Sequence, residues 1–172
     1  MPFAFGHLIG AWLAGKGYEY FRKRKISSKA WFFLLFGSIL PDIDYLFDWL
    51  LETSIHRTFT HSLLFVVTGF LITFLLFKLL HHKEHSSFAL SLAAGIATHL
   101  FLDFFSAKGI PLFWPSTLYI SYVGTHYLAA NAPTLLNAPL ATLQNRIKIA
   151  ILDMALGTAW IFYFWWKKKI QF

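Results

Sequence analysis

The fold is decided by one apolar stretch, FALSLAAGIATHLFLDFF, at residues 88–105. Its length is close to the roughly 20 apolar residues that a helix needs to cross a bilayer. His99 and Asp103 stand near its end, four positions apart. At about 100° per residue they differ by about 40° and share one face of a helix. Because ionisable groups in apolar segments are costly, the pair is a candidate metal site; a structural His–Asp hydrogen bond is the alternative.

The rest of the chain predicts a membrane protein. Hydrophobic residues make up 57% of the sequence and charged residues only 13%, whereas soluble domains contain about 25% charged residues. Further apolar segments are found at residues 30–51, 63–80 and 147–166, and a shorter one at 3–20 should form a tilted or partly inserted helix. Residues 106–146 are divided by prolines into expected loops and short pieces. We therefore predict a single all-α domain over residues 1–172, a polytopic bundle of about four to five spanning helices.

Pro41 interrupts the 30–51 segment, and Asp42 and Asp44 follow it directly. Proline lacks a backbone donor, so we expect the helix to break there. The two carboxylates lie on opposite sides of a turn, which predicts one metal ligand and one supporting or capping carboxylate. Helix capping alone is the alternative explanation for both.

A second polar stretch, HRTFTHS, occupies residues 56–62. His56 and His61 are five positions apart, about 140° on a helix, so both cannot face one ion from a continuous helix. Thr60 or Ser62 is suited to cap the helix that follows. Which histidine binds stays open at this point, and interfacial histidines beside Arg57 are the alternative.

Charge patterning predicts the topology. The net charge of +7 comes from basic residues clustered at the ends of apolar segments, such as RKRK at 22–25 and KKK at 167–169. This pattern indicates anionic lipid headgroups rather than nucleic acid. Placing the 16–29 linker, the 78–87 turn and the C-terminus in the cytoplasm puts eleven of the fifteen Lys and Arg residues there. The candidate ligands, with His7 if the first helix crosses, then lie in the outer half of the membrane.

Four motifs in this order resemble the YdjM family: GHLIG at 6–10, LPDID at 40–44, HRTFTHS at 56–62 and THLFLDFF at 98–105. That family is described as inner-membrane, LexA-regulated metal-dependent hydrolases, and the resemblance covers roughly residues 3–116. Tyr45 departs from the pattern, which often continues with His.

The order of His and Asp residues is also similar to zinc-dependent phospholipase C and the S1/P1 nucleases. That likeness implies one zinc on Asp42 or Asp44, His61 or His56, His99 and Asp103, and a second on His7 with a shared Asp103. Those soluble enzymes also use their N-terminal amine, which six residues separate from His7 here.

Together these observations predict a membrane-bound, metal-dependent hydrolase of the inner membrane, most simply a phosphoesterase for a lipid or amphiphilic substrate. With no Cys in the chain, His and carboxylate must bind the metal, for which zinc is expected, as one or two ions. The expected catalytic residues are His99, Asp103 and Arg57. The expected metal ligands are His7, Asp42, Asp44, His56, His61, His99 and Asp103. Asp153, inside the last span, is expected to pair with Arg57 or a His. A divalent-metal transporter and a non-catalytic structural or regulatory membrane protein are the alternatives.

Overall fold

The computed structural model describes residues 4–51, 56–106, 108–122, 124–127 and 140–167. The α-helices are α1 (Ala4–Arg22), α2 (Ser28–Ile39), α3 (Asp44–Leu51), α4 (Leu63–Leu79), α5 (His85–Phe104) and α6 (Leu140–Trp166). Two strands, β1 (Leu118–Ser121) and β2 (Gly124–Tyr127), and two short 3-10 helices, Leu40–Ile43 and Phe59–His61, complete the described part of the chain. The predicted all-α bundle is confirmed.

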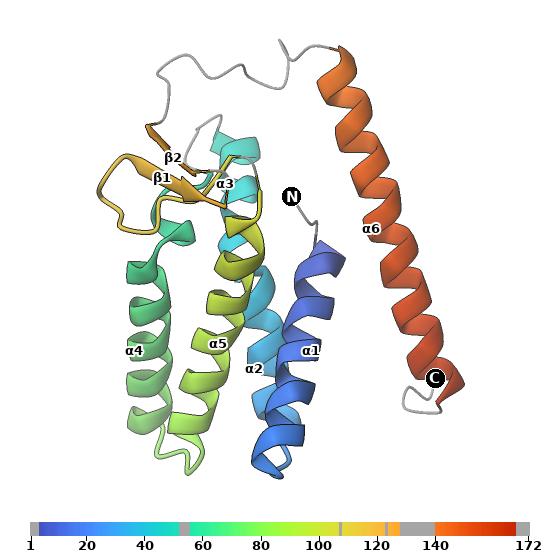
Figure 1. Ribbon diagram of the computed structural model, residues 1–172. Coiled ribbons are helices and arrows are strands. Elements are labelled where there is room, and N and C mark those ends of the chain that lie inside the picture. The colour runs from blue at the N-terminus through green and yellow to red at the C-terminus, as the bar shows by residue number, and fades with distance from the viewer. Residues whose placement is uncertain (1–3, 52–55, 107, 123, 128–139, 168–172) are drawn as a thin grey trace.

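Helix α5 lies at the centre of the bundle, with α1, α2 and α4 packed against it (Figure 1). The backbones of α2 and α5 approach closely at two glycines. A Cβ on Gly37 would overlap the Leu92 carbonyl group, and one on Gly95 would overlap the Leu34 carbonyl group. Small residues permit this kind of contact between membrane helices. The contact places His99, one turn beyond Gly95, beside the end of α2.

The predicted break at Pro41 is confirmed, because α2 ends at Ile39 and a 3-10 turn leads into α3. The last carbonyl groups of a helix lack partners within that helix. One of them, the Ser38 carbonyl, accepts a hydrogen bond from His99 Nδ1 at 2.8 Å. The proline therefore ends α2 where its free carbonyl group can orient a histidine of α5.

Three segments among the described helices are long and apolar enough to cross a membrane: Ser28–Asp48, His85–Phe104 and Ile147–Trp166. Helix α4 is equally apolar but has only 17 residues. Large apolar side chains on the outside of α4 and α6, such as Ile72 and Met154, are 66% and 63% exposed. Such faces are suited to lipid contact.

Two expectations need correction. Residues 106–146 hold a β-hairpin in which β1 pairs antiparallel with β2, Leu118 lying opposite Tyr127. Strands of four residues are too short for an alternating pattern to be distinct in the sequence. Helix α6 begins at Leu140 rather than at Ile147, because the polar residues before Ile147 end the apolar run without ending the helix.

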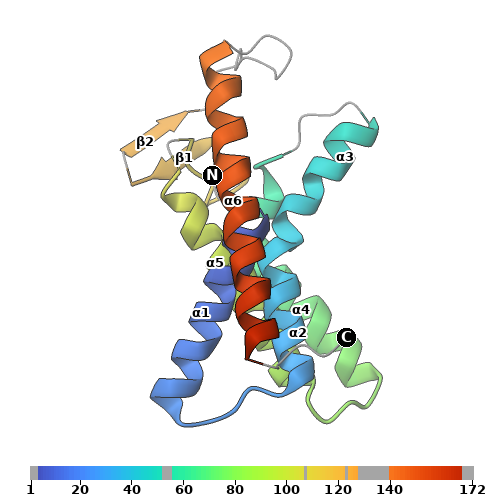
Figure 2. The same cartoon turned by 90° about the vertical axis from the view of Figure 1, so that its right-hand side faces the viewer.

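The bundle has two different ends (Figures 1 and 2). The α1–α2 connection, the α4–α5 turn and the end of α6 lie together at one end. The hairpin, α3 and the start of α6 lie at the other. The basic α1–α2 linker and the polar motifs therefore lie at opposite ends of the bundle. This separation agrees with the charge pattern, which predicts that basic connections lie on one side of the membrane.

Candidate metal centre

Five side chains from separate parts of the chain converge at the hairpin end of the bundle. They come from α1, from the two 3-10 turns and from the last turns of α5: His7, Asp42, His61, His99 and Asp103. Four of them are 0% exposed, and the Asp42 side chain is 24% exposed. The ionisable groups are therefore gathered at one buried point, of which Asp42 is the most accessible member.

The atoms that face one another are those that bind metals. His61 Nε2 lies 3.3 Å from His99 Nε2 and 3.5 Å from Asp42 Oδ1. His99 Nε2 lies 3.6 Å from the same Asp42 oxygen. Ligand atoms about 2.0–2.1 Å from one tetrahedral zinc lie about 3.3 Å from each other. The spacing of these three groups is therefore that of ligands around one ion.

His7 and Asp103 complete the cluster from the other side. His7 Nε2 is 3.6 Å from Asp103 Oδ1 and 4.0 Å from Asp42 Oδ2. Asp103 Oδ2 is 3.7 Å from His61 Nε2. The His7 ring stacks on the His99 ring, with centroids 3.7 Å apart. Ligand-type atoms of His7, His99 and Asp103 lie within 4.8 Å of one another, a second spacing that fits a metal ion.

Hydrogen bonds fix which nitrogen of each central histidine carries its proton. A carbonyl oxygen only accepts, so His99 Nδ1 donates to Ser38 and the neutral ring has its lone pair on Nε2. Thr60 Oγ1 donates to Asp44 Oδ2 at 2.5 Å, so this hydroxyl accepts from His61 Nδ1 at 3.0 Å. The Nε2 lone pairs of His61 and His99 therefore point at each other. A cation between them removes the repulsion.

Unpaired buried atoms point to the same conclusion. Within the described residues, His7 Nε2, Asp42 Oδ1 and Asp103 Oδ1 are buried without a hydrogen-bond partner. Leaving a buried polar group unpaired costs about 1–3 kcal/mol. Three unpaired atoms around two opposed lone pairs fit a divalent cation in residue type, spacing and charge. Burial alone would lower the pKa of His61, but the carboxylates of Asp42 and Asp44 raise it, another sign that the site favours positive charge.

Asp44 and His56 form a second unit beside the centre. His56 Nδ1 is 2.6 Å from Asp44 Oδ1, and its ring stacks on Tyr45 at 3.5 Å. Its Nε2 is buried and has no hydrogen-bond partner among the described residues. Ligand-type atoms of Asp42, His56 and His61 lie within 4.8 Å of one another. The structure therefore separates the paired candidates: Asp42 and His61 face the centre, and Asp44 orients His56.

Arg57 anchors the loop after α5. Its Nη2 contacts Asp103 Oδ2 at 2.7 Å, and its Nη1 donates to the Gly109 carbonyl at 2.6 Å. Its φ of 63° is unfavourable for a non-glycine residue. Asp44 Oδ2 accepts from the Arg57 N–H, and the Tyr119 hydroxyl donates to the Arg57 carbonyl at 2.8 Å. Burial raises the pKa of Tyr119, which keeps this donor protonated.

Several contributors were not predicted from the sequence: the Ser38 carbonyl, Thr60, Tyr119 and the Gly109 carbonyl. Pro41 is a usable signal for the first, since it frees a carbonyl group nearby.

The expectation for Asp153 was wrong, because its carboxylate accepts from backbone N–H groups of α1 instead of pairing with Arg57 or a His.

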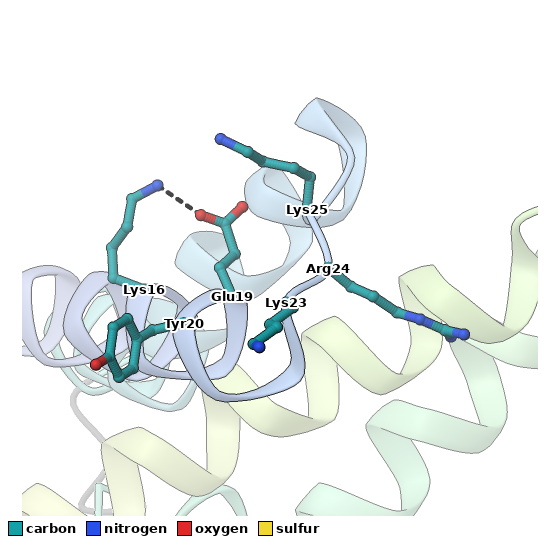
Figure 3. A pocket seen from close by; sticks show the side chains of 6 residues that line it. All are labelled: Lys16, Glu19, Tyr20, Lys23, Arg24 and Lys25. Carbon is teal, nitrogen blue, oxygen red and sulfur yellow. Dashed lines mark hydrogen bonds and ion pairs between the residues drawn. The ribbon is translucent and has the colours of Figure 1, made fainter.

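In the part of the chain that the structure describes, the basic residues near the end of α1 do not converge on one point. A surface hollow at the far end of α1 is lined by Lys16, Glu19, Tyr20, Lys23, Arg24 and Lys25. Figure 3 shows Lys16 held by Glu19, while Lys23, Arg24 and Lys25 point in different directions. A spread of cations like this is suited to a headgroup layer rather than to one bound anion.

Comparison with known proteins gives the family. The chain matches the family described as YdjM inner membrane protein over residues 1–170. It belongs to that family. The predicted resemblance to YdjM is thereby confirmed, and the chain is an inner membrane protein whose apolar helices lie in the lipid bilayer.

A named relative covers part of the chain. Uncharacterized protein YvsG of Bacillus subtilis (strain 168) is 41% identical over 63 residues. The match covers 37% of this chain and 36% of the length of that protein, so it spans about a third of each. No solved structure matches the chain.

Proposed function

We propose that the chain is a membrane-embedded, metal-dependent hydrolase that cleaves a phosphoester in a lipid or other amphiphile. The observation that carries the proposal is the convergence of His7, Asp42, His61, His99 and Asp103 with two opposed lone pairs. When bound, a divalent ion such as zinc supplies an acidified water and Lewis-acid activation of a phosphoryl oxygen. The spacing supports one or two ions, since the ligand-type atoms form two groups, His7 with His99 and Asp103, and Asp42 with His56 and His61.

The Asp44–His56 pair is suited to proton transfer. Asp44 fixes the His56 tautomer by accepting from Nδ1, so that Nε2 is left with its lone pair. A ring nitrogen of His56 lies within 4.8 Å of ligand-type atoms of Asp42 and His61, which supports a role for this ring beside the centre. A carboxylate-oriented histidine acts as general base and then as general acid in many hydrolases. We assign this role to His56, and orientation of the pair to Asp44.

Arg57 supports the centre by fixing Asp103 and the loop after it. Its Nη1 and Nη2 are occupied by Gly109, Asp103 and Ser106. Catalysis by Arg57 would therefore act through Asp103, whose ligand oxygen it positions.

The surroundings favour an amphiphilic substrate. Asp42 is the most accessible member of the centre. Beside it in the chain, Ile43 of the same 3-10 turn is 44% exposed, and Tyr45 and Leu46 of α3 are 47% and 49% exposed. A polar centre whose open side adjoins apolar surface accommodates a phosphate group joined to an acyl chain. This arrangement also favours hydrolysis over metal transport, because ligands gather at one end of the bundle.

The proposal is tested with the full chain purified in detergent. We expect a stoichiometric divalent metal in the wild type, and a loss of at least about 10–100-fold in zinc affinity for His99→Ala and Asp103→Asn. Thr98→Ala is the matched control on α5, because the Thr98 hydroxyl contacts only the Ala94 carbonyl of its own helix. Absence of metal from the wild type would end the proposal of a metal centre.

Activity is measured separately in vesicles of phosphatidylglycerol and phosphatidylethanolamine. We expect metal-dependent release of the phosphorylated headgroup by the wild type and by Thr98→Ala, but not by His99→Ala. A protein that binds metal and releases no headgroup, but carries the ion across the vesicle membrane, would favour the transporter instead.

A further inference from the structure

Helix α1 begins without a capping side chain of its own. The first four N–H groups of a helix have no partner within it, and a side-chain oxygen just before the helix usually accepts from one of them. The residues before Ala4 are Met, Pro and Phe, none of which carries a side-chain oxygen. The start of α1 therefore needs an acceptor from elsewhere.

Asp153 of α6 supplies that acceptor. Its Oδ2 accepts from the Phe5 N–H at 3.1 Å, and its Oδ1 accepts from the Gly6 N–H at 2.6 Å. The side chain is buried, with 4% exposure. One turn further along α6, Gly157 leaves the space that the Phe5 ring fills. The two helices thus meet at the N-terminus of α1 (Figure 2).

A carboxylate inside a membrane span is a costly way to cap a helix. Asp153 lies in the Ile147–Trp166 segment, which is otherwise apolar enough to cross a membrane. Two N–H donors and the positive end of the α1 dipole offset part of the cost of burying the charge. Intramembrane carboxylates mark functional positions, and the residue that follows this capped turn is His7.

His7 is the centre's least supported histidine. His99 is oriented by the Ser38 carbonyl, and His61 by Thr60. Neither ring nitrogen of His7 has a hydrogen-bond partner among the described residues. Its ring is held by stacking on His99 and by the backbone of the first turn of α1. Whatever fixes that turn fixes the direction of His7 Nε2.

We propose that Asp153 is a positioning residue for the metal centre: by holding the N–H groups of Phe5 and Gly6, it aims His7 at the ion. The inference rests on the metal centre proposed above. It gives α6 a role in the site although α6 contributes none of its proposed ligands.

The test is a double-mutant comparison in the full chain, with Zn²⁺ alone as the probe. We expect Asp153→Asn to weaken zinc binding by about 10–100-fold, the loss typical of removing a group that orients a ligand. In the His7→Ala background, Asp153→Asn should cause no further loss. With Co²⁺ in place of zinc, the visible absorption of Asp153→Asn should resemble that of His7→Ala, because both lack the same nitrogen ligand.

Controls for correct folding use contacts and positions on the same two helices. The ring contacts of Trp12 with Trp160 and Phe164, at 6.2 and 5.4 Å, do not involve Asp153 and should keep α6 on α1 in the variant. Thr158→Asn places an amide on the exposed side of α6 and should bind zinc like the wild type.

Two results would overturn the inference while leaving the proposed metal centre intact. One is wild-type zinc affinity in Asp153→Asn. The other is a loss that adds fully to that of His7→Ala. A wild-type protein without any metal affinity would instead refute the centre itself and, with it, the role of Asp153.

Discussion

At the scale of single residues, the chemistry of the centre follows from where three protons are placed. The Nδ1–H groups of His99 and His61 donate to the Ser38 carbonyl and the Thr60 hydroxyl, and that of His56 donates to Asp44. Each histidine is therefore left with its lone pair on Nε2. Two of these lone pairs face each other at 3.3 Å. The third belongs to His56, to which we assign proton transfer rather than metal binding.

The two histidines of the 56–62 stretch should consequently respond differently to the same substitution. We expect His61→Gln to weaken zinc binding by at least about 10–100-fold. His56→Gln should keep zinc within a few-fold of the wild type and lower headgroup release by about 10²–10⁴-fold, the usual contribution of a general base. Zinc competition with a chromophoric chelator and the vesicle assay measure the two effects. Equal loss of zinc in both variants would contradict the division of roles.

This division could not be predicted from spacing. Five positions on a continuous helix exclude a shared ion, but the segment is a loop followed by a 3-10 turn. Between the two histidines, Arg57 adopts a left-handed conformation that no sequence pattern indicates, because contacts with Asp44 and Tyr119 impose it. The partner of Asp153 was missed for a related reason, because backbone N–H groups are not visible in a sequence. The indirect signal was the lack of a capping side chain before α1.

At the scale of elements, the site depends on how closely α2 and α5 approach. The lengths of the apolar runs and the break at Pro41 were predictable, since both are local properties of the sequence. The hairpin was not, because its strands are too short for a clear alternation. The close approach of the α2 and α5 backbones depends on Gly37 and Gly95. The sequence alone does not show which backbone atoms face these glycines.

A methyl group at that contact should therefore destabilise the protein. For Gly95→Ala, the added Cβ meets the Leu34 carbonyl and the Ser38 backbone, neither of which can move as a side chain would. We expect a loss of about 1–3 kcal/mol, the usual cost of overpacking, and weaker zinc binding because His99 shifts. Thermal unfolding in detergent measures the first effect.

Gly17→Ala is the matched control for that substitution. Gly17 is also in a helix, and a Cβ there would have nothing within 4 Å. Alanine should be neutral or stabilise the helix by up to about 1 kcal/mol. Equal destabilisation by both alanines would show that the glycines matter for reasons other than the α2–α5 contact.

At the scale of the whole molecule, the two ends of the bundle differ in both charge and chemistry. The linker at 23–27 and the α4–α5 turn lie at one end, and the centre lies near the other (Figure 1). Ser27 Oγ donates to Glu84 at 2.8 Å, which ties the two basic connections together. Since basic connections stay in the cytoplasm, the polarity of the fold predicts that the centre faces the outer half of the inner membrane.

Cysteine labelling tests this orientation directly, because the chain has no cysteine of its own. Ser86, in the first turn of α5, and Ser116, between α5 and the hairpin, are both exposed, one at the start of α5 and the other beyond its end. In intact cells, an impermeant thiol reagent that reaches only the outer face of the membrane should label Ser116→Cys and leave Ser86→Cys unmodified. After permeabilisation both should react, which shows that each thiol is accessible. Labelling of Ser86→Cys alone in intact cells would invert the topology and place the centre, with its substrate, in the cytoplasmic leaflet.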